Sequence, residues 1–248
     1  MSGHSKWATT KRKKALVDGK KGKAFTKIIR EMMVAAREGG SDPAGNPRLR
    51  TCLEKAKAVN MPADNITRAI KKGTGELDGQ AFESITYEGY GPGGVAVVID
   101  CLTDSRNRTA ADIRSILSKG GGNLGEVGSV GWMFKRRGFI VLPKDGLKED
   151  EVMELVLEAG AEDMAVTDAT FDVTTAIEDF EKVKKALADK KIVPSSAELT
   201  MIPGNYVKLD GNEAEQMLLL MDSLEDYDDV QNVYANFDIP ESVMEAME

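Results

Sequence analysis

The side chains of this 248-residue chain that are best suited to chemistry are the cations near its amino end. Lysine and arginine are concentrated in two short runs, Lys11-Arg12-Lys13-Lys14 and Lys20-Lys21-Gly22-Lys23. Cations at this density suit phosphate groups, because each one that is placed beside a nucleic-acid backbone releases condensed counterions. Such contacts position a protein without reading a base sequence. The chemistry expected of this segment is therefore phosphate binding.

The net charge of the whole chain conceals this concentration. The formal net charge is −8, yet residues 1–72 carry 18 Lys and Arg against 6 Asp and Glu, a local charge of +12. The remaining residues carry 15 basic and 35 acidic side chains, a charge of −20. This asymmetry predicts a nucleic-acid-facing segment on an acidic body. The alternatives are a solvated helical surface and a basic segment that docks on the chain's own acidic part.

The residue types needed for catalysis are scarce. A single histidine, His4, leaves no histidine triad or multi-histidine metal centre. Two cysteines, Cys52 and Cys101, suffice for neither a disulfide framework nor a zinc site, which is typical of a reducing cytosol. Asp100 and Asp104 have no nucleophile or base near them in the sequence. We therefore expect no enzymatic activity, no catalytic residue, no metal and no small-molecule substrate.

Two glycine patterns match the dinucleotide-binding fingerprint, but their surroundings do not. The pattern that starts at Gly89 runs into a β-rich segment, and the pattern that starts at Gly120 precedes another. Pyrophosphate binding requires a helix after the glycines, so we interpret both as turns and expect no cofactor. The acidic cluster at residues 225–229 lacks the spacing of a calcium loop, and we interpret it as a solvated helix end or interaction surface.

The chain shows no sign of a membrane span or secretion signal. No run approaches the ~18 apolar residues that cross a bilayer, and the amino end has no apolar core of a signal peptide. We expect a cytoplasmic protein without a membrane partner.

Three helices are predicted to carry the basic segment. Apolar residues recur at helical spacing from Gly22 to Gly39, with Lys23, Lys27 and Arg30 on the opposite side. Asn46-Pro47 supplies an N-cap and first helical residue for the second helix, in which Cys52 is expected in the core. A short third helix ends at Lys71-Lys72-Gly73.

The rest of the chain predicts an α+β fold. Residues 138–203 follow the order βαββαβ, which is ferredoxin-like. The preceding segment, with a strand expected at Ser129–Phe134, lacks a final helix and strand, which residues 212–224 and 230–237 supply. We expect three domains, namely a basic helical domain at 1–80, a discontinuous ferredoxin-like domain at 81–137 plus 204–248, and an inserted one at 138–203.

The predicted nucleic-acid-binding residues form two sets. The main set lies in the helical domain and comprises Lys6, Lys11, Arg12, Lys13, Lys14, Lys20, Lys21, Lys23, Lys27, Arg30, Arg48, Arg50, Lys71 and Lys72. A secondary nucleic-acid or ribosome surface comprises Arg106, Arg108, Lys119, Asn123, Lys135, Arg136 and Arg137, beside an exposed glycine-rich loop at 120–125. The alternative for the second set is pairing with carboxylates of the same chain.

The sequence resembles the YebC/PmpR family over essentially its whole length, and several motifs carry the resemblance. They include Gly3-His4-Ser5-Lys6-Trp7-Ala8, Asn46-Pro47-Arg48-Leu49-Arg50 and Ser105-Arg106-Asn107-Arg108-Thr109, together with 25–31, 87–94 and 121–125. The resemblance implies three domains and a DNA-binding transcriptional regulator, as bacterial members are described. Mitochondrial relatives are translational activators of cytochrome oxidase, which implies ribosomal RNA and the ribosome as the alternative partner.

Overall fold

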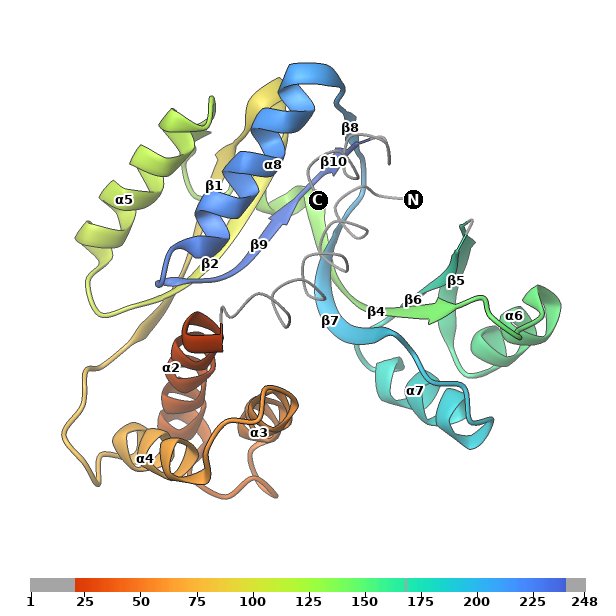
Figure 1. Ribbon diagram of the computed structural model, residues 1–248, viewed down its shortest axis with the longest axis horizontal. Coiled ribbons are helices and arrows are strands. Elements are labelled where there is room, and N and C mark those ends of the chain that lie inside the picture. Colours follow the sequence, from red (N-terminus) through yellow and green to blue (C-terminus); the bar gives the residue numbers. More distant parts are fainter. Residues whose placement is uncertain (1–20, 168, 240–248) are drawn as a thin grey trace.

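The computed structural model describes residues 21–167 and 169–239, and these residues form a helical unit and two α+β units (Figure 1). The expected α+β class with three domains is confirmed. The helical unit holds α2 (Lys21–Gly39), α3 (Pro47–Ala58) and α4 (Ala63–Thr74). Its core gathers Met32, Leu49, Cys52 and Ala69, so Cys52 is a core residue, as predicted.

The join between α2 and α3 depends on one asparagine. The Asn46 side chain accepts a hydrogen bond from the Leu49 N–H at 3.0 Å and donates to the Ala35 carbonyl at 2.8 Å. The predicted N-cap is therefore confirmed, and the same side chain also ties the two helices together. The third helix does not end at Gly73 as expected. Gly73 lies inside α4, where a side chain would meet the Met33 carbonyl, and the left-handed cap is Gly75, with φ of 83°.

The middle unit is built on a four-stranded antiparallel sheet. Its elements are β1 (Glu83–Tyr90), β2 (Ala96–Thr103), α5 (Arg106–Lys119), β3 (Asn123–Leu124), α8 (Gly211–Asp226) and β9 (Val230–Ala235), with strand order β3-β1-β2-β9. Two short pieces, β8 (Val207–Lys208) and β10 (Phe237–Asp238), pair in parallel beside it. Helices α5 and α8 cover one face (Figure 1). Strand β9 pairs with β2, so segments more than 100 residues apart share one core.

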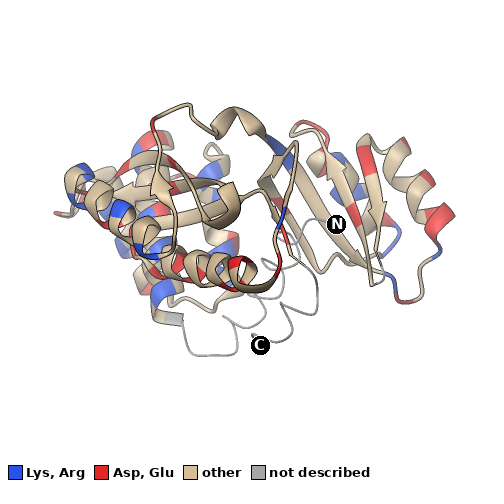
Figure 2. Ribbon diagram, turned by 90° about the horizontal axis from the view of Figure 1, so that it is seen from above, with Lys and Arg blue, Asp and Glu red and all other residues tan. Residues whose placement is uncertain are grey.

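The inserted unit has the predicted βαββαβ order. It runs through β4 (Phe134–Pro143), α6 (Glu149–Glu158), β5 (Ala161–Val166), β6 (Thr170–Thr175), α7 (Phe180–Asp189) and β7 (Ser196–Pro203), with strand order β5-β6-β4-β7. The expected boundary between residues 137 and 138 falls inside β4, which pairs with β7 from Phe134 onward. Acidic positions recur along α6 at the far end of this unit (Figure 2).

The expected strand at Ser129–Phe134 is wrong. This segment is a turn followed by the single 3₁₀ turn η2 (Gly131–Met133). The Glu88 carboxylate accepts hydrogen bonds from the backbone N–H groups of Gly128, Val130 and Gly131 at 2.8, 2.7 and 2.6 Å. These three donors are therefore unavailable to a β-ladder, and extended pairing begins only at Phe134.

Candidate nucleic-acid interface

The cationic stripe predicted along α2 faces the middle unit of the same chain. Lys27 Nζ donates to the Glu225 carbonyl at 2.7 Å, and Lys23 Nζ donates to the Asp226 carbonyl at 3.3 Å. These carbonyls belong to the last turn of α8, a helix whose own last turn contains no basic residue. The unpaired carbonyls and negative dipole at a helix C-terminus favour cations, which α2 supplies from outside.

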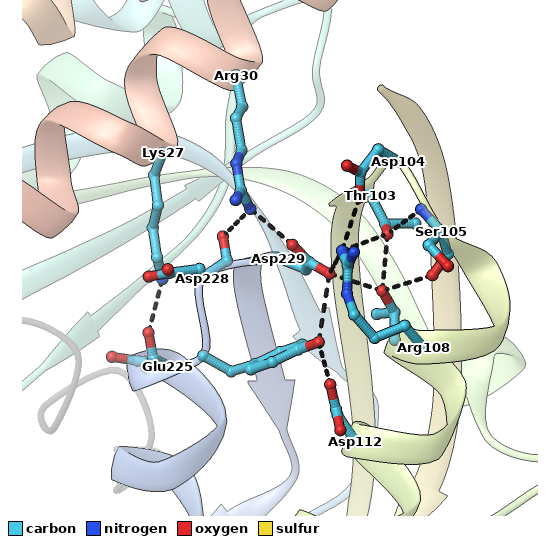
Figure 3. Close-up of polar contacts among 12 residues, drawn as sticks. Lys27, Arg30, Thr103, Asp104, Ser105, Arg108, Asp112, Glu225, Asp228 and Asp229 are labelled. Atoms are coloured by element: carbon cyan, nitrogen blue, oxygen red, sulfur yellow. Dashed lines mark hydrogen bonds and ion pairs between the residues drawn. The ribbon is translucent and has the colours of Figure 1, made fainter. Parts of the chain in front are cut away.

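Arg30 extends this contact to a buried carboxylate. Its Nη1 atom lies 2.7 Å from Asp229 Oδ1 and also donates to the Asp228 carbonyl (Figure 3). The Arg30 guanidinium lies over the ring of Phe82, with 5.1 Å between the guanidinium carbon and the ring centroid. The three cations at positions 23, 27 and 30 follow one helix face. That face is a docking surface within the molecule, which was one of the alternatives left open by the sequence.

Asp229 is the centre of the polar network at this contact. Its side chain is only 3% exposed, and Oδ2 accepts from Arg108 Nη2 at 2.8 Å and from Thr109 Oγ1 at 2.7 Å. Tyr227 Oη donates to Asp112 Oδ2 at 2.6 Å and lies 3.3 Å from the same oxygen of Asp229. A buried carboxylate is tolerated when its lone pairs are satisfied in this way. Residues 225–229 were expected to form a solvated helix end or an interaction surface, and Asp229 belongs to an interaction surface within the chain.

The network shifts the titration of its members. Burial on its own raises the pKa of Asp229, but the hydrogen bonds from Arg108 and Thr109 outweigh burial and hold the pKa below its ordinary value. Burial and the bond to Asp112 raise the pKa of Tyr227 to about 12. Burial likewise raises the pKa of Cys101 to about 12, with a further contribution from the charge of Asp229. At neutral pH the site is thus an ionised carboxylate between two guanidinium groups, with neutral phenol and thiol groups around it.

The other predicted cations of the helical unit have different surroundings. Arg48 forms an exposed ion pair with Glu38 at 2.6 Å, and Arg50 donates to the carbonyls of the loop before α3. Lys71 and Lys72 are exposed in the last turn of α4, and neither makes an ion pair with any residue in 21–167 or 169–239. Lys6, Lys11, Arg12, Lys13, Lys14 and Lys20 lie outside the described residues, as does the side chain of Lys21.

The residues of the predicted secondary surface also fall into two groups, those in ion pairs within the chain and those that are exposed. Arg106 pairs with Glu83 at 2.8 Å, Arg108 with Asp104 at 2.7 Å, and Arg137 with Glu162 at 2.8 Å. For these three residues the structure favours the alternative of pairing within the chain. The side chains of Lys119, Asn123, Lys135 and Arg136 are exposed.

The glycine-rich loop approaches the backbone of its own chain. A Cβ atom on Gly122 would lie 2.1 Å from the Tyr90 carbonyl oxygen, and one on Gly120 would lie 2.7 Å from the Leu220 side chain. Glycine is required at these positions because β1 and α8 occupy the space of a side chain. The loop was expected to suit close approach to another backbone or to be a wide turn, and the contacts of Gly120 and Gly122 are with the same chain.

Two features of the site were not predicted from the sequence. Asp229 was grouped with its acidic neighbours. However, Val230 begins the buried strand β9, so the chain passes from an exposed to a buried environment at this point. Glu88 organises residues 128–131, and its pKa is lowered because three backbone hydrogen bonds outweigh the effect of burial. No pattern around Glu88 distinguishes it from an ordinary strand carboxylate.

The two carboxylates considered for acid–base chemistry both have partners in the described part of the chain. Asp100 accepts a hydrogen bond from Thr86, and Asp104 is paired with Arg108. No group of three or more His, Cys, Asp or Glu side chains among the described residues is placed to hold a metal ion. Over the same residues, no helix combines the length and the apolar character that a bilayer crossing demands.

Comparison with known proteins identifies relatives over the full length of the chain. A family model described as "TACO1/YebC protein N-terminal domain" matches residues 5–76, and "TACO1/YebC second and third domain" matches residues 82–237. A protein of Chlorobaculum parvum is 57% identical over 100% of this chain and 99% of its own length. One from Syntrophobacter fumaroxidans is 56% identical over 99% of each chain. Both are named "Probable transcriptional regulatory protein", a name that describes regulation rather than catalysis.

A solved structure agrees with this placement. The crystal structure of a conserved hypothetical protein from Aquifex aeolicus superposes with a TM-score of 0.79 and 46% sequence identity. The match covers 91% of this chain and 93% of that one, so the likeness extends across all three units. With the family models matching most of its residues, the chain belongs to the TACO1/YebC family.

Proposed function

We propose that this protein is a cytoplasmic regulator of gene expression that binds DNA through its basic helical domain. The names of its relatives support a regulatory role. The observation that carries the DNA-binding proposal is a cationic surface on α4 that the rest of the described chain does not neutralise.

This surface comprises Arg68, Lys71 and Lys72. The three residues stand at i, i+3 and i+4 on α4, so they share one helix face, and all are exposed. None makes an ion pair with a described residue, in contrast to Lys23 and Arg30 on α2. Arg68 was not among the predicted binding residues and joins the surface because the helix brings it beside Lys71 and Lys72.

Phosphate contact fits these groups better than base reading. Lysine and arginine at the end of a short helix supply point charges for a backbone, and no strand or helix of sequence-reading type accompanies them among the described residues. The run at residues 11–14 and Lys20 precede α2 in the sequence and add to the basic charge of the helical domain. The binding that we propose is therefore strongly salt-dependent and weakly sequence-dependent.

The test is the salt dependence of binding to a short labelled DNA duplex. The variant carries Lys71→Glu and Lys72→Glu. Its matched control carries Lys185→Glu and Lys190→Glu, two exposed cations in the middle of α7 and at its C-cap. Each lost phosphate contact lowers the slope of log K against log salt by about 0.9, so the α4 variant should lose up to about 1.8. The control should retain the parent slope.

An unchanged slope in the α4 variant would overturn the assignment of this surface. Phosphate contacts do not distinguish DNA from ribosomal RNA, so the same variants should also be sedimented with ribosomes at about 150 mM salt. Ribosome association that persists at this salt, while duplex binding is lost, would replace the transcriptional role with a translational one.

A further inference from the structure

A large aromatic side chain stands out from the surface at the junction between the middle and inserted units. Trp132, in η2, is 76% exposed. Val127, in the preceding turn, is 93% exposed. Exposed tryptophan is costly to solvate and is characteristic of binding surfaces. Because the Trp132 ring is mostly exposed, it contributes little to the stability of the fold, and we look for a role in binding.

The segment that carries Trp132 is held in a defined conformation. The Glu88 carboxylate accepts three backbone N–H groups from residues 128–131, and Val130 is fully buried against Ala96 and Val98. Trp132 Nε1 donates to the Ser129 carbonyl at 3.2 Å. The only polar atom of the indole ring is thus satisfied within the chain, and the π-face remains available to a partner. A fixed ring binds at a lower entropic cost than a mobile one.

Two exposed cations follow this ring closely in the sequence. Lys135 and Arg136 stand three and four residues after Trp132, at the start of β4, so their Cα atoms lie at most about 14 Å from that of Trp132. As consecutive strand residues, they point to opposite faces of the sheet. Both side chains are exposed, and neither forms an ion pair with another described residue, whereas the adjacent Arg137 is paired with Glu162. Within residues 125–132, the one exposed carboxylate is that of Glu126. The nearby carboxylate of Glu88, on β1, is taken up by its three hydrogen bonds to backbone N–H groups.

A second exposed aromatic residue lies on a neighbouring segment. The Gly204 N–H donates to the Met133 carbonyl at 2.9 Å, which joins the chain after β7 to η2. Tyr206, two residues further on, is 43% exposed. Two aromatic residues on adjoining segments, flanked by cations, are the combination that binds unpaired nucleotides, because bases stack on the rings while phosphates face the cations.

We propose that Trp132, with Lys135 and Arg136, forms a stacking platform for unpaired bases of single-stranded nucleic acid. A duplex hides the faces of its bases in the helical stack, so this platform should discriminate against double strands. The platform lies on different elements from the α4 surface and does not depend on it. A chain with both would contact duplex phosphates and unpaired bases at separate places.

The experiment uses tryptophan fluorescence in the full-length chain. Only two tryptophans are present, so Trp7→Phe leaves Trp132 as the sole reporter. Titration of this variant with oligouridylate at about 150 mM salt should quench the fluorescence by stacking, and duplex DNA should not. Absence of quenching by oligouridylate, or equal quenching by the duplex, would overturn the proposal.

Affinity for labelled oligouridylate provides the second measurement. Stacking contributes about 1–3 kcal/mol per base, so Trp132→Ala should weaken binding by about 5- to 150-fold, while Trp132→Phe should retain most of it. Lys135→Glu with Arg136→Glu should reduce the salt slope by up to about 1.4, at about 0.7 per single-strand phosphate. Val193→Ser, at another exposed apolar residue of the inserted unit, is the control and should bind as the parent does.

The results separate this proposal from the proposed function. Trp132 is solvent-facing, so its variants should keep the thermal transition of the parent, and each is checked by circular dichroism. Lys71→Glu with Lys72→Glu should weaken duplex binding and leave Trp132 quenching unchanged. Equal affinity of Trp132→Ala and the parent for oligouridylate would refute the platform, whatever happens to duplex binding.

Discussion

Replacement of Asp229 by asparagine should destabilise the contact between the helical and middle units more than any other single change of one charge in residues 225–229. The carboxylate is 3% exposed and accepts from Arg30 at 2.7 Å, Arg108 at 2.8 Å and Thr109 at 2.7 Å. Removal of one partner from a buried ion pair costs about 3–5 kcal/mol. Asparagine keeps the shape and one acceptor oxygen, so we expect about 3 kcal/mol.

The measurement is differential scanning calorimetry with Asp228→Asn as the matched control. The Asp228 side chain is exposed, and Arg30 contacts only its carbonyl, so the control removes the same charge without breaking the network. For a chain of this size, about 3 kcal/mol lowers the unfolding temperature by about 6–12 °C. The control should shift it by less than about 2 °C, as a surface change does. Equal shifts in the two variants would refute the assignment of Asp229 as the centre of the network.

The pH dependence of this difference gives an independent check. The pKa of Asp229 is lower in the folded chain than the unperturbed value of about 3.9. Its stabilising effect is therefore fully present above about pH 4 and is lost as the pH falls through the folded pKa. The difference in stability between parent and Asp229→Asn should be constant from about pH 5 to 7 and shrink below about pH 4. A difference that grows on acidification would contradict the network.

Two further predictions follow from packing and burial. Gly122→Ala places a methyl group against the Tyr90 carbonyl, so it should destabilise the middle unit by about 1–3 kcal/mol in chemical denaturation, whereas Gly22→Ala, which meets nothing within 4 Å, should be nearly neutral. Equal effects of the two would show that the loop shifts freely. Burial raises the pKa of Cys52 and of Cys101 to about 12, so a thiol reagent at pH 8 should label neither in the folded chain and both in denaturant. Rapid labelling of the native protein would contradict this.

Much of the fold is predictable from the sequence because local patterns and the core agree. The apolar spacing of α2, the Asn46-Pro47 start of α3 and the βαββαβ order of residues 138–203 all appear in the structure. Strand β2 was readable as an unbroken apolar run since it is buried on both faces, by the helices and by the segment around Val130 and Phe134. The turn at 128–131 could not be predicted, because the Glu88 carboxylate on β1 determines its conformation and no local sequence pattern indicates that contact.

The candidate site was less predictable, since residue type does not reveal what a charge faces. Lys23, Lys27 and Lys71 are alike in sequence terms, yet the first two contact the end of α8 and the third is exposed without a described ion-pair partner. Arg108 was assigned to a binding surface and instead contacts Asp104 and Asp229. Only the arrangement of three units in space separates these cases.

One signal of the docking was nevertheless present in the sequence. The end of α8 and the turn after it carry Glu225, Asp226, Asp228 and Asp229, although a helix C-terminus disfavours negative charge. Such an end requires cations from elsewhere, and the stripe on α2 provides them. A polyanion that captured this stripe would have to separate Arg30 from a carboxylate that is almost wholly buried. The cost of that separation favours phosphate contacts on α4, where no such contact has to be broken.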